Sequence, residues 1–479
     1  MLRLGSTKLH EASLTGLVSF RAFSWIIILC AAAMAQQQPA PTPTPRTGRA
    51  YSAPDLPKTP PPAGPQAASP VTFTDVTAQT RITFKHAASA TSQKYLLETM
   101  GAGVAMLDYD NDGRLDLFFT NGAQLKDPMG KGDVPDKRNP RYWNRLYQQK
   151  PDDTFIDITE QAGLKGEGYS MGAAVGDYDN DGYVDLYVTG YGENHLYHNN
   201  GNGAFSDVTR KLGVSAGGWS TSAGWFDYDR DGRLDLFIAR YLDWDFEKGS
   251  IFCGEARPGG RAFCHPDNFK GVTNLLYHQL PDGTFEEVTT KAGMADPSGK
   301  ALGVAFADFD NDGLLDVFVA NDSVRQSLYR NNDDGTFEDV AVMAGAGYDE
   351  NGKTFAGMGV DAADFENDGH MDVVMSVVDG PPVVLRNKGS KNHWLGVRLA
   401  AMKNRDGFGP RITVVDGSGR RHIFDVNNAG SYLSSNDSRV VVGLGNAVTV
   451  RTVEVRWPNG QVEKIANPTI DRYLTINDH

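Results

Sequence analysis

A nine-residue acidic motif that occurs five times holds the residues of this sequence best suited to chemistry. Each copy has carboxylates at positions 1, 3, 5 and 9 and a glycine at position 6. Four carboxylates around one tight turn repel one another unless a cation lies between them, and Ca²⁺ accepts about 6–8 oxygen ligands in flexible geometry. The glycine permits the sharp turn, and position 7 would add a backbone carbonyl. We therefore predict up to five Ca²⁺ sites, formed by Asp108, Asp110, Asp112, Arg114 and Asp116; Asp177, Asp179, Asp181, Tyr183 and Asp185; Asp227, Asp229, Asp231, Arg233 and Asp235; Asp308, Asp310, Asp312, Leu314 and Asp316; and Asp364, Glu366, Asp368, His370 and Asp372.

Other interpretations of the motif fit less well. It resembles the first half of an EF-hand loop, but position 12 is not glutamate and an apolar β-type run follows in place of a helix. Mg²⁺ is disfavoured because its small octahedral shell keeps bound waters. Asp-rich turns without any metal are a further alternative, which the five full copies argue against. The fifth loop is the weakest candidate, since the longer side chain of Glu366 replaces aspartate there.

Each acidic motif lies within a longer repeat. A Gly/Ala-rich stretch such as SMGAAVG precedes it, a β-type run such as LYVTG follows it, and segments like NHLYHN and GAFSDVT recur further on. Repeated units of four short strands are typical of β-propeller blades. We therefore predict an all-β propeller over residues 71–390, with five blades counted and up to about seven possible at the usual repeat length.

The two ends of this repeat region suggest how the ring closes. The last acidic repeat has three strands before the sequence changes character, while an isolated strand of the fourth type lies at residues 73–77. Pairing of this strand with the last blade would leave no free sheet edge. We therefore predict that residues 73–77 complete the fifth blade.

Two long insertions, at residues 121–144 and 241–273, join the second and third strands of their blades. Such loops emerge on the face opposite the acidic loops, and they are rich in aromatic residues. Exposed aromatic side chains are common anchors for sugar and protein partners. The alternative is that they pack the long loops onto the ring. The ligand-face candidates in the insertions are Tyr142, Trp143, Tyr241, Trp244 and Phe246, accompanied by Phe252 and Phe263. Trp219, near a loop between the fourth strand of one blade and the first strand of the next, is a further candidate.

The N-terminal segment is typical of an export signal. Arg3, Lys8 and Arg21 precede an apolar run over residues 23–33, and small residues follow, so we predict a signal peptide over residues 1–35 that is cleaved before Gln36. A lipid anchor on Cys30 and an uncleaved membrane anchor are the alternatives. The protein is therefore expected to be secreted, at the cell surface or periplasmic, with no membrane span in the mature chain. Residues 36–70 form a Pro-rich linker.

Only two cysteines follow the predicted signal peptide. In an exported protein, Cys253 and Cys264 are most simply a local disulfide, with two buried thiols as the alternative.

Charge and composition exclude some classes of protein. The chain has 479 residues and a formal net charge of −14, which argues against a nucleic-acid partner because nucleic acids need a positive groove. A composition with 22% charged and 40% hydrophobic residues is that of a folded protein.

Catalytic motifs are weak. Residues 168–172 fit the G-x-S-x-G string of serine hydrolases, but they open a blade strand where the motif needs a strand followed by a helix. His195 and His198 point to opposite faces of a strand, so we interpret them as ordinary polar surface residues. We predict that the protein is not an enzyme. A propeller with paired carboxylates that acts on a polysaccharide or glycan is the alternative.

The acidic loops between Gly/Ala-rich strands resemble the FG-GAP, or integrin-type, repeats. Residues 391–479 resemble the ASPIC/UnbV domain, at residues 392–395, 404–409, 430–435, 443–445 and 455–460. Together these features resemble the cartilage acidic protein family, which implies an exported, calcium-binding, non-catalytic protein linked to cell adhesion or extracellular recognition. Pro410 departs from the family pattern, which has small residues there.

The residues of this C-terminal segment support a domain of their own. Alternating strands joined by Gly, Asn and Asp turns predict a small β-sandwich or barrel-like domain over residues 391–479. The overall hypothesis is a calcium-stabilised propeller that recognises an extracellular protein or glycan. The identity of the ligand and the oligomeric state stay open.

Overall fold

The computed structural model describes residues 47–48, 75–364, 367–377, 382–400, 410–426, 439–457 and 461–477. The chain divides into two compact units, Met1–Arg46 and Thr47–His479, and all the described residues belong to the second. The predicted signal peptide and most of the Pro-rich linker lie outside them. Among the described residues, no helix combines the length and the apolar character that a membrane crossing requires.

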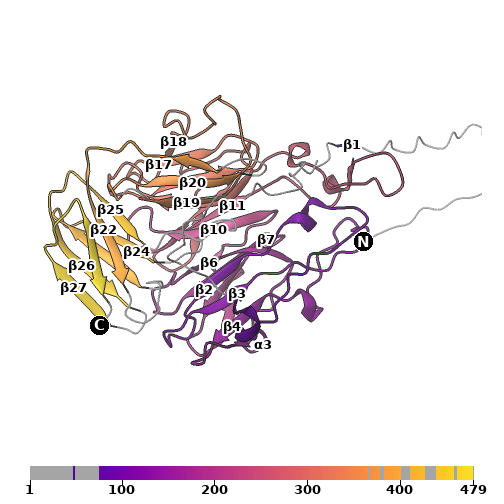
Figure 1. Cartoon of the computed structure of the whole chain (residues 1–479), viewed down its shortest axis with the longest axis horizontal. Coiled ribbons are helices and arrows are strands. Elements are labelled where there is room, and N and C mark those ends of the chain that lie inside the picture. Colours follow the sequence, from indigo (N-terminus) through magenta and orange to yellow (C-terminus); the bar gives the residue numbers. More distant parts are fainter. Residues whose placement is uncertain are drawn as a thin grey trace, which may run out of the picture. The chain divides into compact units, whose positions relative to one another are not determined.

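Five antiparallel sheets follow one another along the chain as the blades of the predicted propeller (Figure 1). Four have four strands each, and the fifth has three strands among the described residues. The strands are β2 (Val104–Leu107), β3 (Asp116–Phe119), β4 (Arg145–Gln149) and β5 (Phe155–Asp157); β6 (Tyr169–Gly176), β7 (Asp185–Tyr191), β8 (His195–Asn199) and β9 (Phe205–Asp207); β10 (Ser220–Phe226), β11 (Asp235–Arg240), β13 (Leu275–Gln279) and β14 (Phe285–Glu287); β15 (Ala301–Ala307), β16 (Asp316–Asn321), β17 (Ser327–Asn331) and β18 (Phe337–Asp339); and β19 (Gly357–Ala363), β20 (Asp372–Val377) and β21 (Val383–Leu385).

The apolar cores lie between neighbouring blades. Separate buried clusters join the first blade to the second, the second to the third, the third to the fourth and the fourth to the fifth. The first strands of adjacent blades approach closely, since Gly103 N–H donates to Met171 O at 2.7 Å. A Cβ atom on Gly103 would lie 2.6 Å from that oxygen. Close approach of these backbones therefore explains why the first strands are rich in Gly and Ala.

The fourth strand of the first two blades is followed by one helical turn, α3 (Thr159–Ala162) or α4 (Thr209–Leu212). A matching turn, α2 (Thr77–Thr80), lies in the segment predicted to close the ring. The residues that precede the three turns have nearly equal backbone angles, with φ between −109° and −116°. Residues 73 and 74 lie outside the described part. The prediction of a strand over residues 73–77 is wrong for Thr77, which begins the helical turn α2. The segment does repeat the end of the first two blades, because the same helical turn occurs there.

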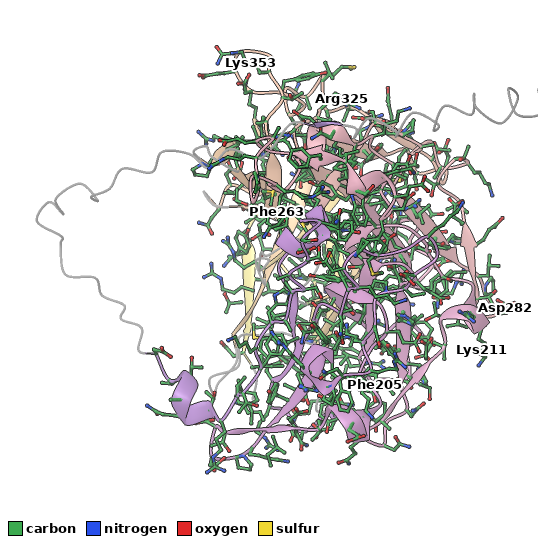
Figure 2. The ribbon with its side chains drawn as sticks, turned by 90° about the vertical axis from the view of Figure 1, so that its right-hand side faces the viewer. Phe205, Lys211, Phe263, Asp282, Arg325 and Lys353 are labelled. Atoms are coloured by element: carbon green, nitrogen blue, oxygen red, sulfur yellow. A yellow bond between two sulfur atoms is a disulfide. The ribbon has the colours of Figure 1, made fainter. Side chains whose placement is uncertain are left out.

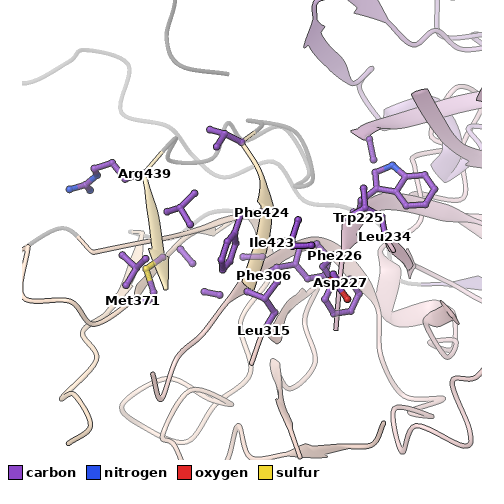
Figure 3. Close-up of a pocket in the computed structure, with 18 of the residues that line it drawn as sticks. Trp225, Phe226, Asp227, Leu234, Phe306, Leu315, Met371, Ile423, Phe424 and Arg439 are labelled. Carbon is purple, nitrogen blue, oxygen red and sulfur yellow. The ribbon is translucent and has the colours of Figure 1, made fainter. Parts of the chain in front are cut away.

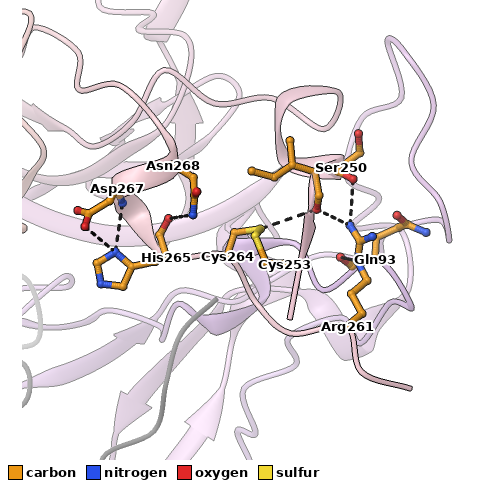
Figure 4. The surroundings of a disulfide bond; sticks show 9 residues. Gln93, Ser250, Cys253, Arg261, Cys264, His265, Asp267 and Asn268 are labelled. Carbon is orange, nitrogen blue, oxygen red and sulfur yellow. Dashed lines mark hydrogen bonds and ion pairs between the residues drawn. A yellow bond between two sulfur atoms is a disulfide. The ribbon is translucent and has the colours of Figure 1, made fainter. Parts of the chain in front are cut away.

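The two insertions and residues 95–100 share one apolar core. They contain the short helices η1 (Leu96–Thr99), η2 (Pro140–Tyr142), η3 (Lys248–Ser250) and η4 (Pro266–Asn268). Strand β12 (Phe252–Cys253) pairs in parallel with β1 (Thr47–Gly48), a two-residue strand within the predicted linker. Cys253 and Cys264 are joined by a disulfide inside this core (Figure 4). The long loops are therefore a packed structure and not free surface loops.

The C-terminal region is a β-sandwich. One sheet has the order β25 (Val440–Gly445), β22 (His393–Ala400) and β28 (Tyr473–Asn477), and the other has the order β24 (Arg421–Asp425), β23 (Arg411–Asp416), β26 (Val450–Arg456) and β27 (Val462–Ala466). Leu395, Val442, Ile412 and Val453 from the two sheets meet in one buried cluster. Its segments at 404–409 and 430–435, and part of 455–460, lie outside the described residues.

Candidate metal centres

The aspartate at position 1 organises each acidic loop. In all five loops its Oδ1 accepts the backbone N–H of position 5 at 2.9–3.0 Å, and its Oδ2 accepts the N–H of the glycine at position 6 at 2.8–3.0 Å. The aspartate at position 5 accepts the N–H of position 7 at 2.8–3.1 Å. One hydrogen-bonded turn is therefore repeated five times.

The backbone of this turn requires glycine. Position 6 has φ between 81° and 93° in the five loops, a region that side chains with a Cβ atom rarely adopt. Position 4 is also left-handed, with φ between 56° and 62°, and is asparagine in four loops and arginine in one. Asparagine tolerates this conformation better than most residues.

The aspartate at position 9 begins the second strand and ties the loop to the third strand. Its Oδ1 accepts, at 2.8–2.9 Å, the backbone N–H of the last residue of that strand or, in the fifth blade, of Asn387 two residues beyond it. In the first four loops its Oδ2 accepts the N–H of position 2 at 3.0–3.3 Å. All five position-9 carboxylates are at most 2% exposed. They are therefore buried anions in contact with backbone donors.

Burial raises the pKa of the position-9 carboxyls of the first four loops when no cation is bound. The pKa of Asp116 rises to about 8, that of Asp185 to about 9 and that of Asp316 to about 8, chiefly through desolvation and further through the neighbouring aspartates. Burial likewise raises the pKa of Asp108 to about 6 and that of Asp227 to about 7. The buried carboxylates of these poorly hydrated turns thus repel one another when no cation is bound.

The geometry brings oxygen atoms together around a small centre. Ligand atoms of Asp108, Asp110 and Asp116 lie within 4.8 Å of one another, as do those of positions 1, 3 and 5 in the second and third loops. Asp110 Oδ1 is buried and has no hydrogen-bond partner. A hard cation such as Ca²⁺ fits an oxygen-rich centre of this kind. Glu366, predicted as a ligand in the fifth loop, lies outside the described residues.

Side-chain amides link each loop to the next, a feature that the sequence interpretation missed. The residue at the end of the third strand donates from its side chain to the carbonyl of position 2 in the preceding loop, at 2.8–3.0 Å. The same residue gives its backbone N–H to the aspartate at position 9 of its own loop. The pairs are Asn199 with Tyr109, Gln279 with Tyr178, Asn331 with Tyr228, and Asn387 with Phe309. The signal in the sequence was an amide residue at this place in every repeat.

The C-terminal domain contacts the acidic loops of the second, fourth and fifth blades. Arg411 Nη2 donates to Asp177 O at 3.2 Å, and the Tyr473 hydroxyl donates to Asp364 Oδ2 at 2.8 Å. Gly445 N–H donates to Asn311 O at 2.9 Å, and Asn392 Nδ2 donates to Asp310 O at 3.0 Å. A cavity of about 140 Å³ lies where the first strands of the blades meet this domain, lined by Trp225 and Phe306 from the blades and by Phe424 (Figure 3). The C-terminal domain is therefore in contact with at least three of the candidate metal loops.

The structure corrects the prediction of an exposed aromatic ligand face. Trp219 is fully buried, and Tyr241, Trp244 and Phe246 are at most 6% exposed. They stack edge to face, with ring centroids 5.1 Å apart for Trp219 and Tyr241 and for Trp244 and Phe246. Three of these rings come from the second insertion and Trp219 directly precedes β10, and all four pack in one cluster with residues of the first insertion. The packing alternative is therefore correct for these four.

The remaining aromatic candidates are half-buried. Tyr142 and Trp143 lie at the end of the first insertion. Trp143 has Lys165 Nζ 4.3 Å and Arg145 Cζ 5.3 Å from its ring centroid. Phe263, labelled in Figure 2, lies in the second insertion with Lys94 Nζ 5.3 Å from its ring. These rings keep a surface that a partner could contact.

The histidines of β8 are not ordinary surface residues, so that prediction is wrong. His195 is 6% exposed, and its Nδ1 lies 2.8 Å from Asp207 Oδ2. His198 lies against the second acidic loop. Ser170 of the G-x-S-x-G string lies within strand β6, is 3% exposed, and accepts a hydrogen bond from Lys137 Nζ at 2.7 Å. The string therefore forms no strand-to-helix elbow.

Comparison with known proteins agrees with this architecture. Residues 108–188, 177–238, 268–319 and 308–375 match the FG-GAP-like repeat, and residues 400–479 match ASPIC and UnbV. The chain is 24% identical over 276 residues to cartilage acidic protein 1 of Homo sapiens and of Mus musculus. This match covers 45% of the chain and 41% and 42% of those proteins, so the chain matches only about two fifths of their length.

Two solved structures show weaker likeness. One is an Agrocybe aegerita lectin that recognises non-reducing terminal N-acetylglucosamine, with 15% identity, a TM-score of 0.33 and coverage of 77% of this chain and 81% of that one. The other is an N-acetylgalactosamine deacetylase from F. plautii, with 11% identity, a TM-score of 0.22 and coverage of 80% and 90%. The assignment rests on the repeats and the blades: the chain is an FG-GAP-repeat β-propeller protein with a C-terminal ASPIC/UnbV domain, distantly similar to cartilage acidic protein 1.

Proposed function

We propose that this protein is exported, that its acidic loops bind Ca²⁺, and that the propeller stabilised in this way is a non-catalytic module for adhesion to, or recognition of, an extracellular protein or glycan. The observation that carries the proposal is the repetition of one carboxylate-rich turn in all five loops. Each turn has the same hydrogen bonds and a buried aspartate at position 9.

Calcium is the cation that this chemistry favours. The loop donors are carboxylate and carbonyl oxygens, which suit hard cations. The loops have the flexible, many-oxygen character of Ca²⁺ sites, whereas Mg²⁺ demands a near-ideal octahedron and retains water. A bound divalent cation would compensate the buried carboxylates of Asp116, Asp185 and Asp316, whose pKa values burial raises. Calcium would therefore serve structure and not a reaction step.

The half-buried aromatic pair Tyr142 and Trp143 supports a recognition role. Amphipathic rings that keep an exposed edge anchor many protein and sugar partners. Arg145 and Lys165 flank Trp143, so a ligand there would meet both an apolar surface and positive charge. Export is supported by the signal-like N-terminus and by the disulfide between Cys253 and Cys264.

Calorimetry of the metal-stripped mature protein, with and without added Ca²⁺, tests the metal part of the proposal. Each occupied site adds about 2.7 kcal/mol of stability at a free Ca²⁺ concentration near 100 Kd, so the melting temperature should rise strongly. An unchanged melting temperature would overturn calcium binding.

A glycan array and a protein-binding screen test the recognition part. Binding should be weakened by Trp143→Ala and left intact by Val342→Ala, an exposed residue far along the chain. A turnover screen on polysaccharides and glycans serves as the opposing measurement. Reproducible turnover would replace the binding module with an enzyme.

A further inference from the structure

In four of the five blades, a side chain at or just beyond the end of the third strand lies beside the acidic loop of its own blade. This side chain belongs to the residue directly before the Asn or Gln that links one loop to the next. In the first blade, Gln148 Nε2 lies 2.5 Å from Asp110 Oδ2, and in the fifth, Arg386 Nη2 lies 3.8 Å from Asp368 Oδ2. In the fourth blade the equivalent Arg330 contacts Glu338 and Asn332 instead. The residue type changes along the chain, as Gln148, His198, His278, Arg330 and Arg386.

The second and third blades both place an imidazole nitrogen beside two carboxylates. His198 Nδ1 lies 3.4 Å from Asp179 Oδ2 and 3.2 Å from Asp185 Oδ1. The equivalent distances from His278 Nδ1 are 3.7 Å to Asp229 Oδ2 and 3.0 Å to Asp235 Oδ1. In each blade the three ligand atoms lie within 4.8 Å of one another. The histidine comes from a different strand, so it is independent of the acidic loop itself.

These separations suit a transition-metal ion. Ligands about 2.0–2.1 Å from a tetrahedral Zn²⁺ lie roughly 3.3–3.4 Å apart. The distances from the imidazole to the carboxylates, 3.0–3.7 Å, bracket that value. One nitrogen and two carboxylate oxygens also form the mixed donor set that Zn²⁺, Co²⁺ and related ions accept, whereas Ca²⁺ selects oxygen.

The surroundings hold each imidazole in place. The ring of His198 packs edge to face on Tyr178, with centroids 6.1 Å apart, and that of His278 packs on Tyr228 with centroids 5.8 Å apart. Tyr178 and Tyr228 occupy position 2 of their acidic loops. The carboxylates of Asp185 and Asp235 are at most 1% exposed. Two blades that differ in sequence thus build the same arrangement.

We propose that the second and third loops each bind a transition-metal dication of the Zn²⁺ class, through Asp179, Asp185 and His198 and through Asp229, Asp235 and His278. This inference rests on the proposed function in so far as the acidic loops are cation sites. It adds that the second and third loops prefer a Zn²⁺-class ion to Ca²⁺. The first loop has an amide in place of the imidazole and therefore remains an oxygen-only site.

Co²⁺ titration of the metal-stripped full chain tests this inference, because Co²⁺ in a four-coordinate site absorbs visible light far more strongly than octahedral Co²⁺ bound by oxygen alone. We expect one Co²⁺ in each histidine loop, displaced by Zn²⁺ with loss of that absorption. His198→Gln and His278→Gln recreate the amide of the first blade, and each should remove one site or weaken it at least about tenfold. Gln148→His should create an additional site in the first blade.

His393→Gln is the matched control. His393 Nδ1 also contacts an aspartate, at 2.8 Å from Asp471 Oδ2, but it faces one carboxylate side chain and no acidic loop. This substitution should leave Co²⁺ binding unchanged. The melting temperature in Ca²⁺ checks that each variant is folded.

The outcomes separate the two proposals. Co²⁺ binding that is unaffected by both histidine variants, together with no gain in Gln148→His, would overturn the inference and leave calcium binding intact. Calcium that fails to stabilise the protein, while Co²⁺ binding still depends on His198 and His278, would overturn the calcium proposal alone. Absence of binding by either ion would defeat both.

Discussion

The phenolic hydroxyl of Tyr473 donates a 2.8 Å hydrogen bond to Asp364 Oδ2, the first carboxylate of the fifth acidic loop. The same oxygen accepts Gly369 N–H at 2.8 Å. Arg439 Nη2 reaches the backbone carbonyl of Asp364 at 3.0 Å. The last described strand of the C-terminal domain therefore takes part in the hydrogen bonding that shapes a candidate metal loop.

Removing this hydroxyl should destabilise the fifth loop and its contact with the C-terminal domain. Tyr473→Phe keeps the ring but removes one hydrogen bond, which is worth about 0.5–1.5 kcal/mol of unfolding free energy. Urea unfolding of the variant and the parent in Ca²⁺ measures the loss. Tyr348→Phe, at a residue 38% exposed, is the control and should leave the midpoint in place. Equal midpoints for Tyr473→Phe and the parent would contradict the coupling.

The stability of the metal-stripped protein should fall as pH rises from about 5 to about 9. Burial raises the pKa of Asp116 to about 8 and that of Asp185 to about 9, so the folded chain holds protons that the unfolded chain loses near pH 4. The native state therefore binds more protons, and each carboxyl lowers the unfolding free energy by up to about 1.4 kcal/mol per pH unit in this window.

Denaturant unfolding at pH 5, 7 and 9 measures this dependence, and the same series in saturating Ca²⁺ is its control. A bound cation compensates the ionised carboxylates, so the calcium series should be flatter. A metal-stripped protein that gains stability over the same range would show that the loop carboxylates are not the dominant titrating groups.

Two tryptophans of the insertions should behave oppositely on substitution. Trp244 is 4% exposed within the shared core, so Trp244→Ala should cost about 3–5 kcal/mol of unfolding free energy. Trp143 is half-buried, and Trp143→Ala should cost within about 1 kcal/mol while weakening partner binding. Thermal melts of both variants give the comparison. A stable Trp244→Ala protein would argue against the packed insertion.

The disulfide should contribute stability to the same core. Replacing Cys253 and Cys264 together by serine is expected to cost about 2–4 kcal/mol, in the usual range for loss of a native disulfide. The melting temperature of the double variant should not respond to dithiothreitol, whereas that of the parent should fall. If dithiothreitol changed the melting temperature of the parent and of the double variant equally, the disulfide would not contribute to the stability of this core.

Local sequence patterns predicted the blades because their physical causes are local. Gly103 marks a close backbone approach, and the glycine at position 6 of each loop marks a left-handed turn. Both requirements act on a single residue, and the left-handed turn has its glycine in every repeat. The composition of the first strands and the spacing of the acidic motif were therefore sufficient to predict the sheets and the loops that join their strands.

Local sequence patterns could not predict which side chains of the insertions are buried or which side chains contact the acidic loops. Trp244 is a core residue because two insertions far apart in the sequence meet each other. His198 faces a candidate metal loop because Asp185 of that loop binds the end of its strand. Both outcomes depend on how strands pair in space, and the sequence around each residue resembles that of an exposed segment.

The amide links between successive loops make the five sites a linear array in which each responds to its neighbours. Asn199 fastens the second loop to the first, and the equivalent links continue to Asn387. A cation that orders one loop also orders the Asn or Gln that is hydrogen-bonded to the adjacent loop. Binding of the next cation therefore costs less conformational entropy. Filling of adjacent sites should thus be positively cooperative. For the fourth and fifth loops, a calcium titration should give a Hill coefficient above one, and a lower value after Asn387→Ala.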